Sequence, residues 1–251
     1  MLTPADIGVA QAGSLLGQTS PLVKLGLALA WLIGLLFTLD PGPPAILALA
    51  AILAGLTLGG IPPSRLAQAF APLSAVALGV GLANLLFSAS NADPAATELA
   101  RVGPLRLTTE AALIAGGLAA RVFAIVSVGA VFAQTTDPAR LVDALVQQGR
   151  APARFAYGAL AAYQALPRLA DDLATIRQAR RIRGLRGGWH PRLFVSLLVR
   201  AIRHADQLAL AMDARAFGSG PRSTFRPISW GWRDLAVGAG GLAVLGAALL
   251  R

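Results

Sequence analysis

The stretch LAQAFAPLSAVALGVGLANLLFSASNA (66–92) carries no charged side chain over its 27 residues. The whole chain of 251 residues is only 14% charged and is 55% hydrophobic, whereas about 25% of the residues in a soluble domain are charged. An α-helix needs about 20 apolar residues to cross a bilayer. The stretch therefore predicts a membrane-spanning helix, and Pro72 predicts a kink near its start.

Similar apolar segments occur on both sides of this stretch. They cover 22–39, 45–60, 111–133 and 235–250. The chain is therefore predicted to be an all-α membrane protein with about five transmembrane helices. Residues 93–110 contain charges of both signs and two prolines, and they predict an extracytoplasmic loop.

The net charge of +10 lies in one region of the chain. Residues 134–233 hold 16 Arg and 6 Asp, whereas the remainder holds 6 basic and 6 acidic residues. Positive charge collects on the cytoplasmic side of membrane proteins. We therefore expect a membrane bundle of four spans (1–133), a cytoplasmic region (134–233) and a C-terminal span (234–251). Five spans then place the N-terminus in the cytoplasm, and residues 1–20 do not resemble a cleaved signal peptide.

The cytoplasmic region is predicted to be helical. Asp137-Pro138 is a typical start of a helix that Gly149 would end, and a second helix is expected over 153–184. His190-Pro191 would begin a third helix that continues to Phe217 and is closed by Gly218. This third helix is amphipathic, because its apolar residues recur at helical spacing: Phe194, Leu197, Leu198, Ile202, Ala205, Leu208 and Met212.

Few residues suggest catalysis or metal binding. The chain has no cysteine and two histidines, which are too few for a histidine-based metal site, and it has no phosphate-binding loop of the form GxxxxGK[ST]. Asp171-Asp172 is the one acidic pair, and without further carboxylates nearby we interpret it as part of a helix surface. Arg121 lies inside the fourth span, where a charge costs about 3 kcal/mol. A structural role for Arg121 between helices is favoured over direct contact with a substrate.

The segment QARRIRGLRG (178–187) concentrates four arginines. It can act through charge alone as a determinant of topology, and nucleic-acid binding is not supported because interleaved aromatic residues are absent. It can also be a docking element, if one arginine at the helix end enters an acidic groove. The sequence IRG (182–184) has a counterpart in ARAFG (214–218), since each places an arginine close to a helix-ending glycine.

Taken in order, several segments resemble the transmembrane (T) component of energy-coupling factor (ECF) transporters, the EcfT/CbiQ family of ABC transporters. GSLLGQTSPLVKL (13–25) resembles the start of that family's first span, and TTDPARLVDALVQQG (135–149) resembles its TT-x-P-x-x-L-x-x-A-L passage. RQARRIRG (177–184) corresponds to its first arginine motif. The closest match is VRAIRHADQLALAMDARAFGSGPRSTFR (199–226).

The resemblance implies a scaffold without enzymatic activity or cofactor in the bacterial inner membrane. Its long cytoplasmic coupling helices would bind two ABC-type ATPase subunits, and a substrate-binding S component would supply the vitamin or the cobalt or nickel ion. The residues that would dock on the ATPases are Arg183, Arg215, Ile182, Gly184, Ala214 and Ala216, with secondary roles for Arg180, Asp213 and Gly218. The family usually has alanine at position 182 and glycine at position 216, so the fit to the grooves is expected to differ.

Two other functions are compatible with the residues alone. A membrane-embedded enzyme acting on a lipid or isoprenoid phosphate could use the arginines to hold phosphate, and it would show turnover without partners. An ordinary ABC permease would instead carry its own substrate pocket. The sequence does not identify the transported substrate.

Overall fold

The computed structural model describes residues 13–38, 40–92, 96–102, 105–185, 190–218, 220, 224 and 226–250. The chain separates into two compact units, one formed by residues 1–141 and 229–251 and the other by residues 142–228. Arg186, one of the four arginines in QARRIRGLRG, and the N-terminus, which is predicted to be cytoplasmic, lie outside the described residues.

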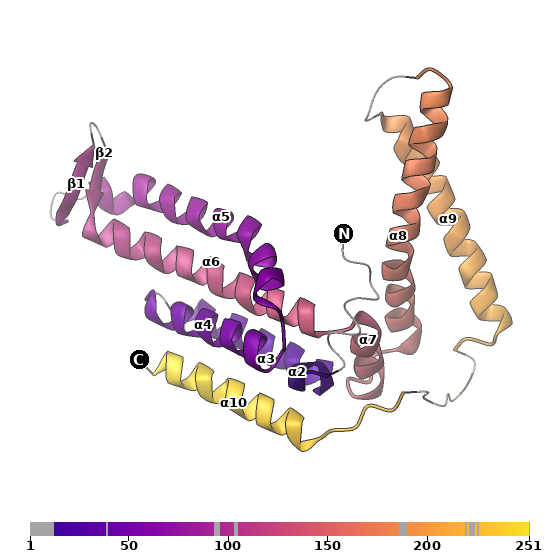
Figure 1. Ribbon diagram of the computed structural model, residues 1–251, viewed down its shortest axis with the longest axis horizontal. Coiled ribbons are helices and arrows are strands. Elements are labelled where there is room, and N and C mark those ends of the chain that lie inside the picture. Colours follow the sequence, from indigo (N-terminus) through magenta and orange to yellow (C-terminus); the bar gives the residue numbers. More distant parts are fainter. Residues whose placement is uncertain are drawn as a thin grey trace. The chain divides into compact units, whose positions relative to one another are not determined.

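Helices form most of the described chain (Figure 1). Among its described residues, the first unit contains one short helix, five long helices, a 3₁₀ turn and two strands: α2 (Leu15–Gln18), α3 (Pro21–Leu36), α4 (Gly42–Thr57), α5 (Pro63–Phe87), η1 (Ala89–Ala92), β1 (Glu98–Val102), β2 (Leu105–Thr108), α6 (Thr109–Thr135) and α10 (Trp232–Leu249). The helices that follow α6 are α7 (Pro138–Gln147), α8 (Ala153–Ile182) and α9 (Pro191–Ala214).

Three described segments are long and apolar enough to cross a membrane: Pro63–Asn91, Thr109–Thr135 and Trp232–Leu249. The other two predicted spans correspond to α3 and α4, apolar helices of 16 residues that are each about 24 Å long at 1.5 Å per residue. α5 contains Pro72 and bends within its N-terminal half, as Figure 1 shows. The prediction of an all-α membrane protein is confirmed.

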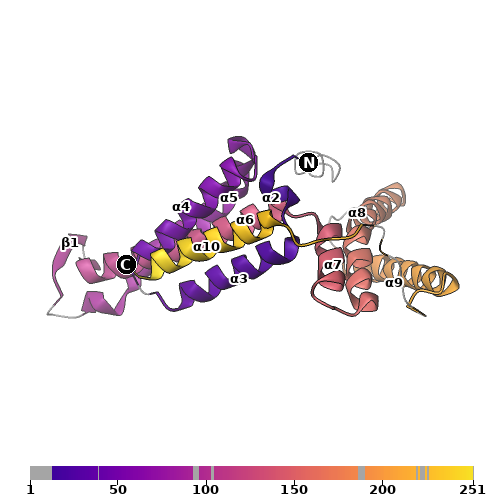
Figure 2. The same cartoon turned by 90° about the horizontal axis from the view of Figure 1, so that it is seen from below.

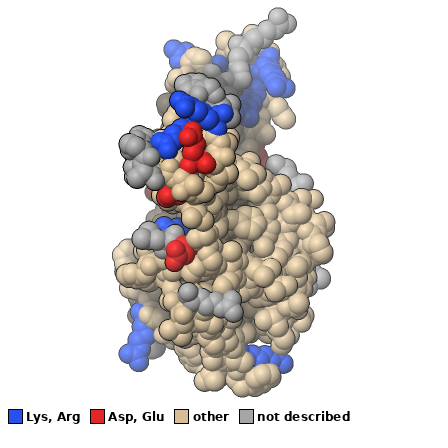
Figure 3. All heavy atoms as spheres, turned by 90° about the vertical axis from the view of Figure 1, so that its left-hand side faces the viewer, with Lys and Arg blue, Asp and Glu red and all other residues tan. Residues whose placement is uncertain are grey.

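The bundle has a core of aromatic, aliphatic and small residues. Trp31 and Leu35 of α3 meet residues of α4, α6 and α10 there, and the remaining members are Leu47, Ala48, Ala51, Ala124, Val128 and Ala248. Many large apolar side chains, such as Leu78 and Phe87, point outward instead. Figure 3 shows one face of the molecule on which uncharged residues form most of the surface. This apolar exterior fits lipid as the solvent.

Glycines let α10 approach α3 closely (Figure 2). A Cβ atom added at Gly241 would lie 2.3 Å from Leu27 Cδ2, and one added at Gly34 would lie 2.6 Å from Leu245 Cδ1. At the same contact Trp31 Nε1 donates a hydrogen bond to the Gly241 carbonyl at 2.9 Å. Small residues serve this purpose in membrane helices generally.

The segment predicted to be a loop over residues 93–110 contains an antiparallel hairpin. The strand LRLT alternates apolar and polar residues, whereas ELARV has two adjacent apolar residues, Leu99 and Ala100, and both strands are too short to be recognised in the sequence. Asn91 Oδ1 accepts hydrogen bonds from the backbone and the hydroxyl of Thr108, each at 3.1 Å. Thr108 in turn caps α6 by accepting from Ala111 N–H, so the hairpin is anchored to the start of α6.

The start signals predicted for the helices of residues 134–233 are present. Asp137 Oδ1 accepts from Ala139 N–H at the start of α7, and His190 Nδ1 accepts from Arg192 N–H at the start of α9. α9 ends at Ala214 and not at Phe217 as predicted. The reason is that Ala216 adopts a left-handed backbone with φ +55°, which a helix cannot continue.

Candidate functional site

The C-terminus of α8 closes in a Schellman motif centred on Arg183. Gly184 N–H donates to Arg181 O at 3.0 Å, and Leu185 N–H donates to Arg180 O at 3.1 Å. Gly184 has φ +73°, the left-handed conformation that glycine adopts without steric cost. Arg183 therefore occupies the C-cap position, directly before the residue that reverses the chain.

The C-terminus of α9 has the same geometry. Ala216 N–H donates to Asp213 O at 2.9 Å, and Phe217 N–H donates to Met212 O at 3.0 Å. Arg215 is the C-cap residue, and Ala216 takes the left-handed position that Gly184 takes in the first motif. The similarity of the two arginine segments thus extends from sequence to backbone hydrogen bonds.

Both motifs present their arginines to solvent. Arg183 and Arg215 are exposed, and so are their neighbours Gly184, Ala214 and Ala216. Ile182 is 87% exposed, so a large aliphatic side chain stands beside Arg183 at the surface. Within the described part of the chain, neither Arg183 nor Arg215 makes a side-chain hydrogen bond or an ion pair. The geometry suits insertion of each guanidinium into a groove on another protein.

The two arginines lie at opposite ends of an antiparallel helix pair. Arg200 Nη1 of α9 lies 2.7 Å from Asp172 Oδ1 of α8, so these two residues face each other across the pair. Arg183 follows Asp172 by 11 residues and Arg215 follows Arg200 by 15, so at 1.5 Å per residue the motifs are separated by roughly 40 Å. In Figure 1 the ends of α8 and α9 that lie away from their connection diverge.

The other predicted site residues fall into two groups. Asp213 and Arg180 belong to the motifs themselves, since their carbonyl oxygens accept the bonds that close the helices. Gly218 (φ +84°) lies just beyond the second motif. Arg121, by contrast, is in α6 in the other unit, where its Nε is buried without a hydrogen-bond partner among the described residues.

The acidic pair Asp171-Asp172 is accounted for in part by the ion pair with Arg200. Asp171 is exposed on α8. Among the described residues, no group of three His, Cys, Asp or Glu side chains could hold a metal ion.

Exposed apolar side chains cover much of α9. Phe194, Leu198 and Ile202 are more than half exposed and are spaced four residues apart, as the amphipathic pattern predicts. Val195 and Val199 extend the same surface. We call these five residues the α9 apolar stripe.

Sequence reasoning missed a set of polar contacts inside the bundle. Lys24 of α3 is buried, and its Nζ donates to the Thr135 carbonyl at the end of α6 at 2.6 Å. Asp234 accepts from Ser20 N–H at 2.5 Å and from Gly231 N–H at 2.8 Å, and so joins the starts of α3 and α10. Single charges at the ends of apolar segments are the signal that could have identified them.

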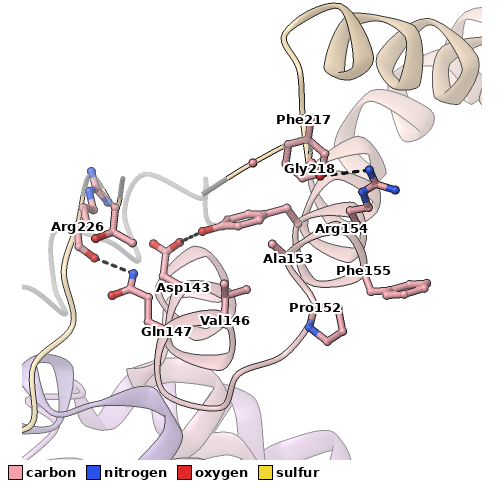
Figure 4. Close-up of a pocket in the computed structure, with 13 residues that line it drawn as sticks. Asp143, Val146, Gln147, Pro152, Ala153, Arg154, Phe155, Phe217, Gly218 and Arg226 are labelled. Atoms are coloured by element: carbon pink, nitrogen blue, oxygen red, sulfur yellow. Dashed lines mark hydrogen bonds between the residues drawn. The ribbon is translucent and has the colours of Figure 1, made fainter. Parts of the chain in front are cut away.

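It also missed the side chains that lie next to the second motif (Figure 4). Tyr157 of α8 donates to Asp143 of α7, and Arg154 donates to the Gly218 carbonyl. They border an open cavity of about 1100 Å³. Their partners are distant in sequence, so no local pattern marks them.

Comparisons with known proteins agree with this arrangement. Residues 14–225 match the family model of CbiQ, the cobalt transport protein. Over 98% of its length the chain is 27% identical to an ABC transporter ATP-binding protein of Bifidobacterium longum (strain NCC 2705), and it spans 32% of that protein. It is 28% identical to the energy-coupling factor transporter transmembrane protein EcfT of Listeria innocua and 29% identical to that of Heliobacterium modesticaldum. Each of these two alignments covers 55% of this chain and 58% of the relative.

The chain thus spans from about a third to somewhat over half of the length of these relatives. The family match nevertheless covers most of the chain and includes both arginine motifs. It also includes α3 to α9, with the apolar bundle helices and the antiparallel pair of α8 and α9. The chain therefore belongs to the EcfT/CbiQ family, the transmembrane components of energy-coupling factor transporters.

Proposed function

We propose that this chain is the coupling subunit of an ECF-type importer. It carries ATP-driven motion from two ABC ATPase subunits to a membrane-embedded S component that binds a vitamin or a metal ion. The chain itself hydrolyses no ATP in this scheme. Residues 1–133 and 234–251 form its membrane part, and residues 134–233 form the cytoplasmic coupling region.

The observation that carries this proposal is the equivalence of the two arginine helix ends. Two similar subunits require two similar docking elements, and Arg183 and Arg215 share the same cap position and the same pair of closing hydrogen bonds. Arginine suits such a role because its planar guanidinium binds a carboxylate through two parallel hydrogen bonds. A separation of roughly 40 Å lets each motif reach a different subunit.

The Bifidobacterium relative supports an ATPase partner. That protein is described as ATP-binding, and the segment similar to this chain makes up about a third of it. A region like this one and an ATP-binding function thus occur in one polypeptide there. In the present protein we place the ATP-binding function in separate subunits that dock on the arginine motifs.

The α9 apolar stripe supports a second partner, one that is itself embedded in the membrane. Its five large side chains are exposed, and such a surface is usually covered in the assembled protein. An S component that lies partly in the membrane offers apolar surface of the kind that would cover it. The excess of arginine in residues 134–233 supports a cytoplasmic position for this region, and with it an inner-membrane location and a cytoplasmic N-terminus.

Co-purification of the ATPase subunits tests the proposal. The double variant Arg183→Glu/Arg215→Glu reverses the charge of both motifs and leaves the backbone caps in place. The matched control is Arg181→Glu/Arg203→Glu, because both residues are exposed on the same helices and the change in net charge is identical. We expect the motif variant to lose the ATPases while remaining in the membrane and the control to retain them.

Equal recovery of the ATPases with the motif variant and with unmodified protein would refute docking through the arginines. Turnover of a lipid phosphate by the purified chain, without any partner, would instead favour the membrane-enzyme alternative. A substrate that stays the same when the S component is exchanged would favour an ordinary permease.

A further inference from the structure

The chain beyond the second arginine motif is held against the corner between α7 and α8 at several points. All of these contacts lie within the unit formed by residues 142–228. Figure 4 shows them around the open cavity. We name the set Asp143, Gln147, Arg154 and Tyr157 the corner cluster.

The first contact joins α7, α8 and the end of α9. Phe217 directly follows the left-handed residue Ala216, and its backbone is fixed by the bond from its N–H to Met212 O. Its ring meets the Tyr157 ring edge-on, with ring centroids 6.3 Å apart and planes at 81°. Tyr157 Oη in turn donates to Asp143 Oδ1 at 2.8 Å. Arg215 lies two residues before Phe217, so these contacts link its helix end to α7 through Tyr157.

The second contact involves Gly218, where the backbone favours glycine. Gly218 has φ +84°, and its carbonyl accepts a hydrogen bond from Arg154 Nη2 at 3.3 Å. A Cβ atom at this position would lie 2.3 Å from Arg154 Nε. The glycine therefore adopts the left-handed backbone beyond the second motif and lets Arg154 lie against the chain.

Gln147, the last residue of α7, makes the third contact. Its Nε2 donates to the Arg226 carbonyl at 3.0 Å, and its Oε1 accepts from Ile228 N–H at 2.9 Å. One side-chain amide thus satisfies a backbone acceptor and a backbone donor at once. The chain that returns toward α10 is bound to the same corner as the Arg215 motif.

The Arg183 motif lacks such support. Ile182 is 87% exposed and Leu185 is 49% exposed. Within the described chain, residues Ile182–Leu185 make no side-chain hydrogen bond, ion pair or ring contact. The two helix ends share their backbone geometry and differ in how they are held.

We propose that Tyr157 is a positioning residue which, with Asp143, makes the Arg215 helix end and the α7–α8 corner move as one body. The proposal rests on the proposed function, since a docked ATPase subunit is what would displace Arg215. The Arg183 end then acts as a docking point, and the Arg215 end is the one through which motion is transmitted. Because α7 directly follows α6 in the chain, the corner cluster is the route by which that motion reaches α6.

Distance measurements between spin labels test this proposal. The chain has no cysteine, so Ala159→Cys on α8 and Ala211→Cys on α9 introduce two exposed and unique labelling sites. Pulsed electron–electron double resonance then reports whether the end of α9 moves relative to α8. It is measured on the purified complex with its ATPases, with and without ATP and vanadate. We expect a single narrow distribution of distances between the two labels, and we expect nucleotide not to change it.

Tyr157→Phe removes the hydroxyl bond to Asp143 and keeps the ring, and Tyr157→Leu removes the ring contact as well. We expect the distribution of distances between the two labels to broaden in Tyr157→Phe and to broaden further in Tyr157→Leu. The ATPases should still co-purify with both variants. Tyr163→Phe is the matched control, because the same hydroxyl is removed from an exposed tyrosine on the same helix. This control should keep the narrow distance.

A distance that shifts with nucleotide in the unmodified complex would overturn the proposal, as would an unchanged distance in Tyr157→Leu. Failure of the ATPases to co-purify with the unmodified chain would instead count against the proposed function. The two failures are therefore distinguishable.

Discussion

Replacing Ala216 by glycine should stabilise the second arginine motif. Ala216 has φ +55° and Gly184, at the equivalent position, has φ +73°. A left-handed backbone costs a residue with a Cβ atom roughly 1–2 kcal/mol, and glycine avoids this cost. The greater conformational freedom of glycine in the unfolded chain offsets roughly 0.5–1 kcal/mol of that stabilisation. The net expected gain is about 1 kcal/mol, which corresponds to about a fivefold change in the equilibrium for opening the helix end.

Amide hydrogen exchange measures this equilibrium locally. The informative amide is that of Phe217, because its N–H donates to Met212 O and closes the motif. In Ala216→Gly its protection factor should rise about fivefold at constant pH and temperature. The full-length protein in lipid nanodiscs is suitable, because global unfolding is not required.

Gly184→Ala is the matched reverse substitution. A Cβ atom at Gly184 meets nothing within 4 Å, so the effect comes from the backbone conformation alone. The Leu185 amide should then exchange about fivefold faster. If Ala216→Gly leaves the Phe217 amide unchanged while Gly184→Ala accelerates Leu185, the second helix end does not have the conformation described.

Two further predictions concern the membrane bundle. Gly241→Ala should lower the unfolding temperature in detergent, because the new methyl group overlaps Leu27 and overpacking costs about 1–3 kcal/mol. The control is Gly246→Ala, whose new methyl group meets nothing within 4 Å and should leave the unfolding temperature unchanged or raise it. Equal unfolding temperatures for the two variants would contradict the close approach of α10 to α3. Asp234→Ala leaves Ser20 N–H without its carboxylate acceptor and should destabilise the bundle by about 1–3 kcal/mol in the same assay; an unchanged temperature would show that this carboxylate is not needed.

The sequence was sufficient to predict elements whose causes are local. Apolar length predicted the bundle helices, and the starts at Asp137 and His190 followed from side chains that accept hydrogen bonds two residues further on. The hairpin at 98–108 was missed because its strands are only five and four residues long and the first of them does not alternate apolar and polar residues. The end of α9 was placed too late, since the left-handed backbone at Ala216 has no glycine to mark it.

The site could be predicted only in part, because local sequence patterns do not show which distant residues come into contact. An arginine before a helix-ending residue occurs twice in the sequence, so the positions of Arg183 and Arg215 at helix ends could be predicted. The contacts of the corner cluster depend on which helices pack together, and Arg154 is 64 residues from its partner Gly218. Lys24 and Thr135 are 111 residues apart. Pairings of this kind are decided by tertiary structure and leave no periodic pattern.

Site-specific cross-linking tests the central claim most directly, namely that both arginine helix ends contact ATPase subunits. The absence of cysteine allows Arg183→Cys and Arg215→Cys to be labelled singly with a photoreactive maleimide, with Arg181→Cys and Arg203→Cys as controls. After illumination of the purified complex, mass spectrometry identifies the cross-linked chain. We predict cross-links to an ABC ATPase subunit from positions 183 and 215 and few from the controls. An absence of ATPase cross-links at both motif positions, or equal yields at the control positions, would contradict the account.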